Sequence, residues 1–224
     1  MNLKQELQGI IQGDVETSPK ALEKKSKDWS IFRVTPSAVV HPKNVKDLQS
    51  LVLFAKKNKG VSLTARSGGT DMTGGPLTES IVVDFSKYFN KVKKIGAKNA
   101  IVQPGVYYRD FEKQTKKKKL LLPSYPASKE ICAIGGMVAN NSGGEKSLVY
   151  GKTEQYVKQL KVILSDGGEY VLRALNRKEL DEKMRLTTFE GEIYRKMFAL
   201  VGENNKILQE AKPAVSKNSA GYAL

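Results

Sequence analysis

Apolar residues along this chain recur at two spacings, and these spacings predict a mixture of helices and strands. Helical spacing, at every third or fourth residue, predicts helices over residues 3–11, 44–59, 106–118 and 176–212. Short apolar runs predict strands at 38–40, 61–65, 81–85, 100–103, 157–164 and 169–172. The last two strands flank Ser165-Asp-Gly-Gly168, which is typical of a tight hairpin turn. The order strand, helix, strand, strand over 38–85 predicts a small right-handed β-α-β unit.

The pattern changes near residue 90, and this change divides the chain into successive parts. We expect residues 1–32 to form a helical arm of one or two short helices, because Leu3, Leu7 and Ile11 share a helical face. Residues 33–90 would form a first subdomain around the β-α-β unit, and residues 91–212 a second subdomain. A further loop and helix over 123–144 would belong to the second subdomain.

The composition is that of a globular protein without disulfides. The 224 residues are 40% hydrophobic, which is enough to bury a core. No apolar run approaches the roughly 20 residues that a bilayer crossing needs, and the first residues do not resemble a signal peptide. The lone cysteine, Cys132, excludes an intrachain disulfide, and the lone histidine, His41, excludes a histidine-based zinc cluster. We therefore expect a cytoplasmic protein with no metal site.

The formal net charge of +15 comes mostly from lysine and suits several kinds of anionic partner. A basic nucleic-acid-binding module is one alternative, but the chain lacks arginine-rich or aromatic-interleaved strands, so we expect no nucleic acid partner. Lys116–Lys119 follow an amphipathic helix and would suit a peripheral position on the inner face of the membrane, although a solvated loop is the simpler interpretation. His41, on a strand-to-helix connection, could be read as a catalytic base, but a structural or surface role is the more common one for a histidine.

Two glycine-rich segments carry the clearest chemical signal. The first is Arg66-Ser-Gly-Gly-Thr-Asp-Met-Thr-Gly-Gly75, and the second is Ile134-Gly-Gly-Met-Val-Ala-Asn-Asn-Ser-Gly-Gly144. Glycine lets a ligand approach the backbone and lets N–H groups converge on an anion, and a helix opened by Gly135 and Gly136 would add its positive dipole end. The first segment is neither a Walker loop nor a Rossmann fingerprint. Together they predict two walls around one phosphate-bearing ligand, although each alone is explained by a turn or a helix cap.

Seven motifs in order resemble the FAD-binding domain of the vanillyl-alcohol oxidase superfamily. They are the two glycine segments and residues 38–44, 102–106, 126–128, 150–151 and 165–167. Within the superfamily, the chain most resembles the group of D-lactate dehydrogenases and glycolate oxidase FAD-linked subunits, over about residues 30–212. The resemblance implies a PCMH-type α+β fold, in which two α/β subdomains hold FAD between them.

The resemblance also assigns residues to the cofactor by position. The first segment would wrap the pyrophosphate mainly through its backbone, the second would line the rest of the nucleotide, and Val162 would offer backbone to the adenine. The residues so implied are Arg66, Ser67, Gly68, Gly69, Thr70, Asp71, Met72, Pro126, Ala127, Gly135, Gly136, Ser142, Gly143, Tyr150, Gly151 and Val162. Where some members attach FAD to a histidine this chain has Thr70, and Cys132 is displaced by one residue from the cysteine that others use. We therefore expect non-covalent FAD and a buried Cys132.

The implied activity is that of an FAD-dependent oxidoreductase, a 2-hydroxy acid dehydrogenase of the D-lactate or glycolate type. It would pass electrons to an acceptor protein or a quinone. In the family the substrate-binding residues lie in a C-terminal domain, and residues 213–224 resemble the connector to it, so a missing domain or a partner subunit would hold the substrate. No catalytic residue is assigned. Two alternatives within this fold stay open: a flavin-binding remnant or fragment without independent activity, and a UDP-N-acetylenolpyruvoylglucosamine reductase-like enzyme.

Overall fold

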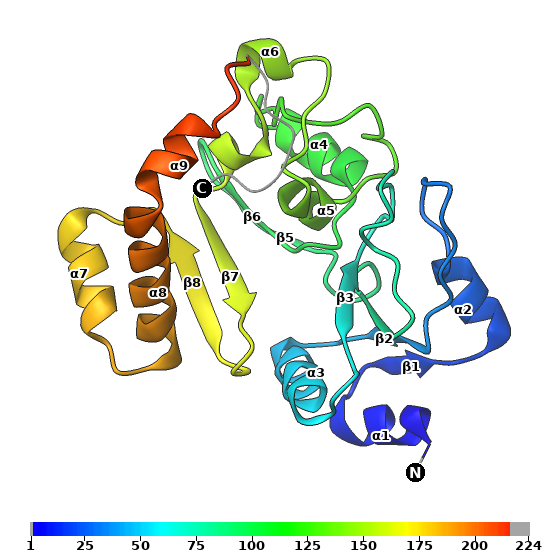
Figure 1. The fold of residues 1–224 in the computed structure, drawn as a ribbon. Coiled ribbons are helices and arrows are strands. Elements are labelled where there is room, and N and C mark those ends of the chain that lie inside the picture. The colour runs from blue at the N-terminus through cyan, green and yellow to red at the C-terminus, as the bar shows by residue number, and fades with distance from the viewer. Residues whose placement is uncertain (1, 216–224) are drawn as a thin grey trace. The chain divides into compact units, whose positions relative to one another are not determined.

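The computed structural model describes residues 2–215, and its first part is built around a four-stranded sheet (Figure 1). The strands are β1 (Asp14–Glu16), β2 (Ala38–His41), β3 (Leu63–Arg66) and β4 (Ile81–Asp84), in the order β1-β2-β4-β3. β4 is parallel to both β2 and β3, and β1 is antiparallel to β2. The carboxyl ends of β2, β3 and β4 therefore lie at one edge of the sheet.

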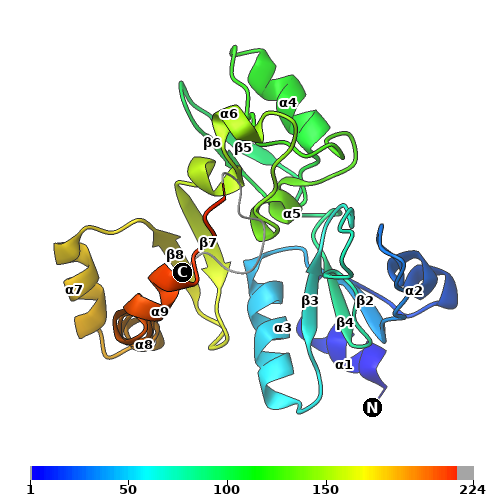
Figure 2. The ribbon, with the colours of Figure 1, turned by 45° about the horizontal axis from the view of Figure 1, so that its top comes forward.

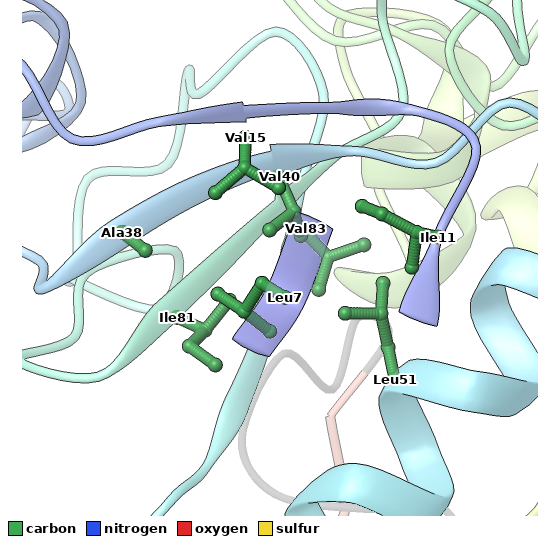
Figure 3. Packing of buried hydrophobic residues seen from close by; sticks show 8 residues of the cluster. All are labelled: Leu7, Ile11, Val15, Ala38, Val40, Leu51, Ile81 and Val83. Carbon is green, nitrogen blue, oxygen red and sulfur yellow. The ribbon is translucent and has the colours of Figure 1, made fainter. Parts of the chain in front are cut away.

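The core of this sheet is an aliphatic cluster to which α1 (Leu3–Ile10) and α3 (Val45–Lys57) contribute. Figure 3 shows its side chains pointing toward one another from both helices and from β1, β2 and β4. β2 and β4 are buried at every position, as expected for the inner strands of a parallel sheet. Asn44 caps α3 by accepting the Asp47 N–H (3.0 Å), and Figure 2 shows α3 running beside β3.

A second group of elements follows and has a core of its own. It contains the antiparallel pair β5 (Val92–Ile95) and β6 (Ala100–Val102), the helices α4 (Tyr108–Lys116), α5 (Ile134–Ala139) and α6 (Ser147–Tyr150), and a 3-10 turn over Thr153–Tyr156. Its apolar cluster includes Tyr108, Cys132 and Met137 and shares no residue with the first cluster. The border predicted near residue 90 falls between β4 and β5, and it stays a prediction.

The described chain divides into two compact units. One comprises residues up to 157 together with 163–169, and the other residues 158–162 together with those from 170 onward. The hairpin of β7 (Gln159–Ile163) and β8 (Glu169–Arg173) lies mostly in the second unit and precedes α7 (Arg177–Arg185), α8 (Phe189–Glu203) and α9 (Asn205–Glu210). Within that unit α7 packs on α8, and Arg177 lies 5.2 Å from the centre of the Phe198 ring. None of the described helices is long and apolar enough to cross a membrane.

The α+β fold class and most predicted elements are confirmed, with ends shifted by a few residues. The helices predicted over 176–212 are α7, α8 and α9. β1 and β5 lie outside the predicted set, because β1 has three residues and β5 carries two lysines between its apolar ends. In the predicted β-α-β unit, β4 lies between β2 and β3, so the two strands joined by α3 are not neighbours. Residues 216–224 of the predicted connector lie outside the described residues.

Candidate functional site

The first glycine segment, residues 66–75, leaves the sheet at the carboxyl end of β3. Asp71 stabilises the far half of the segment, residues 72–75. Oδ2 of Asp71 accepts the N–H groups of Thr73 (3.0 Å) and Gly75 (2.9 Å). Burial raises the pKa of Asp71, but the hydrogen bonds from Thr73, Gly75 and Met72 outweigh burial, and the net pKa is lowered. Asp71 is therefore an ionised internal anchor at neutral pH.

The near half of the segment keeps its N–H groups free. In the described part of the chain, the backbone N–H groups of residues 68–71 have no hydrogen-bond acceptor. Gly69 lies in this stretch with a φ of +65°, a left-handed conformation that glycine adopts without a steric cost. Successive free N–H groups around such a turn form a concavity suited to an anion. The residues expected to bind phosphate are thus the ones that the segment does not use for its own hydrogen bonds.

Residues of the N-terminal arm hold the far half from outside. Asp28 accepts the Gly74 N–H through Oδ2 (3.1 Å), and Trp29 donates its N–H to the Asp71 carbonyl (2.9 Å). The Phe32 ring packs on Gly74, where a Cβ would lie 3.1 Å from a ring carbon. The arm is therefore part of the structure around this segment.

Charged side chains meet at the carboxyl edge of the sheet, beside the segment. Arg66, buried at the end of β3, donates to the carbonyls of Lys25 (3.1 Å) and Lys27 (2.6 Å) at the end of α2 (Pro19–Lys25). Asp84, buried at the end of β4, pairs with the Lys25 ammonium. Burial lowers the pKa of Arg66 and raises that of Asp84, but Lys25 and Ser86 outweigh burial at Asp84, and its net pKa is lowered. The Arg66 side chain is thus committed to the arm, and a cofactor contact of Arg66 stays a prediction.

His41 and Cys132 are both buried, and burial was predicted from the sequence for Cys132. His41 lies at the end of β2, with Nε2 3.2 Å from Oε1 of Glu16, while Nδ1 is 4.0 Å from Oδ2 of Asp84 and has no hydrogen-bond partner. Cys132 packs in the second apolar cluster, and burial raises the pKa of its thiol to about 11. The thiol is therefore protonated at neutral pH.

The second glycine segment begins with α5 at Ile134, and the first N–H groups of this helix are used inside the protein. Ile134 donates to the Val106 carbonyl (2.9 Å), and Gly135 donates to the Pro104 carbonyl (2.8 Å). A Cβ on Gly135 would lie 2.5 Å from Cβ of Pro104, so this glycine is required for packing. The Gly135 N–H is therefore already used within the protein, and the predicted contact of Gly135 with the cofactor stays a prediction.

Gly136, the next residue, is different. Its N–H has no acceptor among the described residues, and a Cβ on it would meet no atom within 4 Å. Glycine within a helix costs up to about 1 kcal/mol relative to alanine, and here no intrachain contact explains it. A glycine that is open to its surroundings suits a ligand that approaches the helix backbone closely.

The structure brings the first segment against residues 131–133, directly before the second segment. A Cβ on Gly68 would lie 2.5 Å from the carbonyl oxygen of Ile131 and 3.3 Å from Cα of Cys132. Ser67 donates through Oγ to the Pro104 carbonyl (3.2 Å), and the same proline packs on Gly135. Figure 2 shows α5 close to the loops that leave β3 and β4. The free N–H groups of residues 68–71 and the open backbone of Gly136 thus belong to adjoining pieces of chain.

The remaining predicted residues of the second segment lie beyond the end of α5. The Ser142 N–H donates to the Met137 carbonyl (2.9 Å), and the Ser142 carbonyl accepts the Thr153 N–H (3.0 Å) and hydroxyl (2.7 Å). A Cβ on Gly143 would lie 2.5 Å from Oγ of Ser147, which makes this glycine a packing residue. Pro126 lies beside the second segment, with its Cα 3.2 Å from a Cβ built on Gly144.

Four predicted residues have few contacts that define a role. Met72 is 76% exposed and Ala127 is exposed, so both side chains are free of the apolar cores. Tyr150 ends α6 half-exposed and its carbonyl accepts the Tyr156 hydroxyl (2.6 Å), while Gly151 has a φ of +73°. Their contacts with a nucleotide stay predictions.

Val162 lies in β7, in the second compact unit. Its predicted contact with adenine stays a prediction.

Three residues that shape this region were not singled out from the sequence. Asp28 and Trp29 belong to the arm, and Pro104 belongs to the turn that follows β6. Their contacts join residues that are 31 to 46 positions apart, for example Asp28 and Gly74, and no local periodicity predicts a contact of that range. The one signal in the sequence is the Val-Gln-Pro-Gly-Val motif at 102–106, to which the resemblance assigns no role.

Comparison with known proteins identifies the family to which this chain is similar. Residues 36–173, more than half of the chain, match the family described as "FAD binding domain". The D-2-hydroxyglutarate dehydrogenase of Pantoea ananatis is 28% identical over 216 residues, which cover 95% of this chain and 21% of that protein. The glycolate oxidase subunit GlcD of Bacillus subtilis is 34% identical over 139 residues, covering 61% of this chain and 29% of that protein.

Solved structures agree on the fold. An alkyldihydroxyacetonephosphate synthase superposes on 79% of this chain and 39% of its own with a TM-score of 0.67 and 23% identity. The 6-hydroxy-D-nicotine oxidase of Arthrobacter nicotinovorans gives a TM-score of 0.64 at 21% identity, over 76% of this chain and 38% of its own. The chain thus spans about a fifth to a third of the curated relatives just named. From the matched residues and the shared fold, the chain belongs to the FAD-binding domain family, and its cofactor is FAD.

Proposed function

We propose that this chain is the FAD-binding part of a 2-hydroxy acid dehydrogenase, and that it holds FAD non-covalently. The observation that carries the proposal is that the first glycine segment, with free N–H groups at residues 68–71, packs against residues 131–133. These residues directly precede the helix that carries the open backbone of Gly136. Support for the substrate class comes from relatives named as D-2-hydroxyglutarate dehydrogenase, glycolate oxidase subunit and D-lactate dehydrogenase.

The residues present suit the FAD pyrophosphate. Residues 68–71 would bind its oxygens through backbone N–H groups, and Gly136 would let the nucleotide approach α5 without a side chain in between. When bound, the flavin supplies the acceptor for the hydride of a 2-hydroxy acid, and the protein contributes binding and orientation. Cys132 is buried with a raised pKa, and Thr70 carries only a hydroxyl, so neither favours a covalent link.

The first test is the visible spectrum of the purified chain, before and after acid precipitation. Non-covalent FAD predicts a flavin spectrum that leaves with the supernatant, and a colourless preparation should become yellow on addition of FAD. A protein that stays colourless with excess FAD would contradict the FAD site. A spectrum that remains in the pellet would contradict only the non-covalent attachment.

The second test concerns the substrate. We expect D-lactate, glycolate or D-2-hydroxyglutarate to bleach the bound flavin under anaerobic conditions once the polypeptide that supplies the substrate-binding residues is present. The L enantiomers of lactate and 2-hydroxyglutarate serve as matched controls. Bound flavin that none of these acids reduces, with that polypeptide present, would overturn the substrate class and leave the FAD site standing.

The remaining parts of the proposal rest on the family resemblance, and a relative named as a subunit supports a partner. A domain or partner subunit outside this chain would bind the 2-hydroxy acid, and electrons would leave to an acceptor protein or a quinone. We place the protein in the cytoplasm, in a position that allows contact with the inner face of the membrane. Co-purification of the tagged chain from cell extract, followed by flavin reduction with the acids above, tests the partner.

A further inference from the structure

The arm holds the first glycine segment with residues that the family match does not include. The match begins at residue 36, whereas the contacts to the segment come from residues 25–32. The carbonyls of Lys25 and Lys27 accept hydrogen bonds from the Arg66 side chain. The carboxylate of Asp28 accepts the Gly74 N–H, and the Trp29 N–H donates to the Asp71 carbonyl. All of them therefore originate outside the matched domain.

The contacts are distributed unevenly along the segment. A loop that offers its N–H groups to a phosphate cannot also use them to hold its own shape, and a loop rich in glycine loses much conformational freedom when it becomes ordered. Here the anchors engage the Arg66 side chain, the Asp71 carbonyl and the N–H groups of residues 73–75. The N–H groups of residues 68–71 are left for a ligand.

We propose that residues 25–32 form a positioning clamp for the first glycine segment, with Asp28 as its principal side chain. The proposal rests on the proposed FAD site. Oδ1 of Asp28 accepts the N–H (2.8 Å) and hydroxyl of Ser30, which fixes the carboxylate, and Oδ2 accepts the Gly74 N–H (3.1 Å). By ordering the segment before FAD arrives, the clamp lowers the entropy cost of binding. Asp28 acts through the backbone of the segment and does not touch the cofactor.

The test compares Asp28→Ala with Asp110→Ala, which removes the same carboxylate from a half-exposed position on α4. Asp110 makes only long surface pairs, at 3.9 Å, with Arg109 and Lys113. We expect Asp28→Ala to weaken FAD affinity about tenfold, the effect of one charge-assisted hydrogen bond, and Asp110→Ala to change it less than about twofold. Asp28→Asn keeps one acceptor oxygen and should give an intermediate loss.

Hydrogen exchange of the protein without FAD separates this proposal from the FAD site itself. The clamp predicts faster exchange of the Gly74 amide in Asp28→Ala than in the unchanged protein, with no change in Asp110→Ala. This result does not require FAD to bind, so it is obtained even if the proposed function fails. Unchanged exchange at Gly74 and unchanged FAD affinity in Asp28→Ala would overturn the clamp.

A purely structural role for Asp28 has a different signature. It would lower the melting temperature without FAD, while the folded variant would bind FAD as tightly as the unchanged protein, and that result overturns the proposal. If Asp28→Ala does not fold, Phe32→Ala replaces it, because the Phe32 ring is 53% exposed and packs on Gly74. The clamp then predicts a loss of about threefold in FAD affinity with Phe32→Ala, and an unchanged affinity would contradict it.

Discussion

The two glycine segments look alike in sequence but are held in different ways. The first depends on carboxylates and on the arm: Asp71, Asp28 and the Arg66 side chain hold it, and its N–H groups at residues 68–71 stay free. The second depends on backbone hydrogen bonds and close packing, since Gly135 bonds to Pro104 and has no room for a Cβ. A glycine-rich stretch by itself therefore does not show which of its residues contact a ligand.

The difference teaches which glycines serve the ligand. A glycine needed for packing has atoms where its Cβ would be, as at Gly68 and Gly135. A glycine that is available to a ligand has open space there and a free N–H, as at Gly136. By this criterion Gly136 is the open glycine of the second segment, whereas Gly68 of the first segment is crowded and offers only its free N–H.

The largest expected effect separates Gly135 from Gly136. Gly135→Ala places a methyl group 2.5 Å from Cβ of Pro104 and 2.8 Å from its carbonyl oxygen, and should lower the free energy of unfolding by about 2 kcal/mol. Gly136→Ala has open space and should raise the stability of the protein without FAD by about 0.5 kcal/mol. The same substitution should weaken FAD binding at least tenfold.

Thermal unfolding and FAD titration of both variants check this prediction. Gly9→Ala, at another open glycine, is the matched control and should leave FAD affinity unchanged. Full FAD affinity in Gly136→Ala would remove the distinction between packing and ligand glycines in α5.

A smaller effect is expected from Gly68→Ala, which acts where the first segment packs against residues 131–133. The new methyl group would lie 2.5 Å from the Ile131 carbonyl and 3.3 Å from Cα of Cys132, so the first segment must move slightly away from these residues. We expect about 1 kcal/mol of destabilisation and faster alkylation of Cys132, which is 3% exposed in the unchanged protein. Iodoacetamide labelling measures this, and labelling as slow as in the unchanged protein would mean that the contact is not needed to cover Cys132.

The smallest expected effect is a difference in the pH at which the two segments are released on acidification. The pKa values of Asp71 and Asp84 are lowered from their usual value of 3.8, so their stabilisation is fully present above that pH. It is lost as the pH falls through the lowered values, when the carboxylates that hold the first segment and the arm become protonated. The second segment depends on backbone hydrogen bonds and should be released later.

Two residues that occur once in the sequence report on the two regions separately. The fluorescence anisotropy of Trp29, on the arm, should fall at a higher pH than that at which Cys132 becomes reactive toward dithiodipyridine. Asp84→Asn should move the Trp29 transition to higher pH and leave the Cys132 transition in place. Simultaneous release of both residues would show that the two regions unfold as one cooperative unit.

Local sequence accounts for most of the individual helices and strands. The period of Val45, Leu48 and Leu51 and the cap at Asn44 specify α3, and the runs Ala38–Val40 and Ile81–Val83 specify buried strands. Local sequence does not specify the strand order. β4 lies between β2 and β3 because of pairing between strands that are distant in the chain, and this pairing forms only during folding. β1 follows the same logic, since a strand of three residues forms only where β2 offers an edge.

What the sequence by itself determined is the family and the two glycine segments, because motif order and local backbone preference are properties of neighbouring residues. Only the tertiary structure decided which glycines are packed and which are open, and that the Gly135 N–H is already bonded to Pro104. It also decided that residues 25–32 anchor a segment some forty residues away, as in the bond from Gly74 to Asp28. Such contacts arise because folding brings distant carbonyls, carboxylates and N–H groups within hydrogen-bond distance, and no period along the chain encodes that distance.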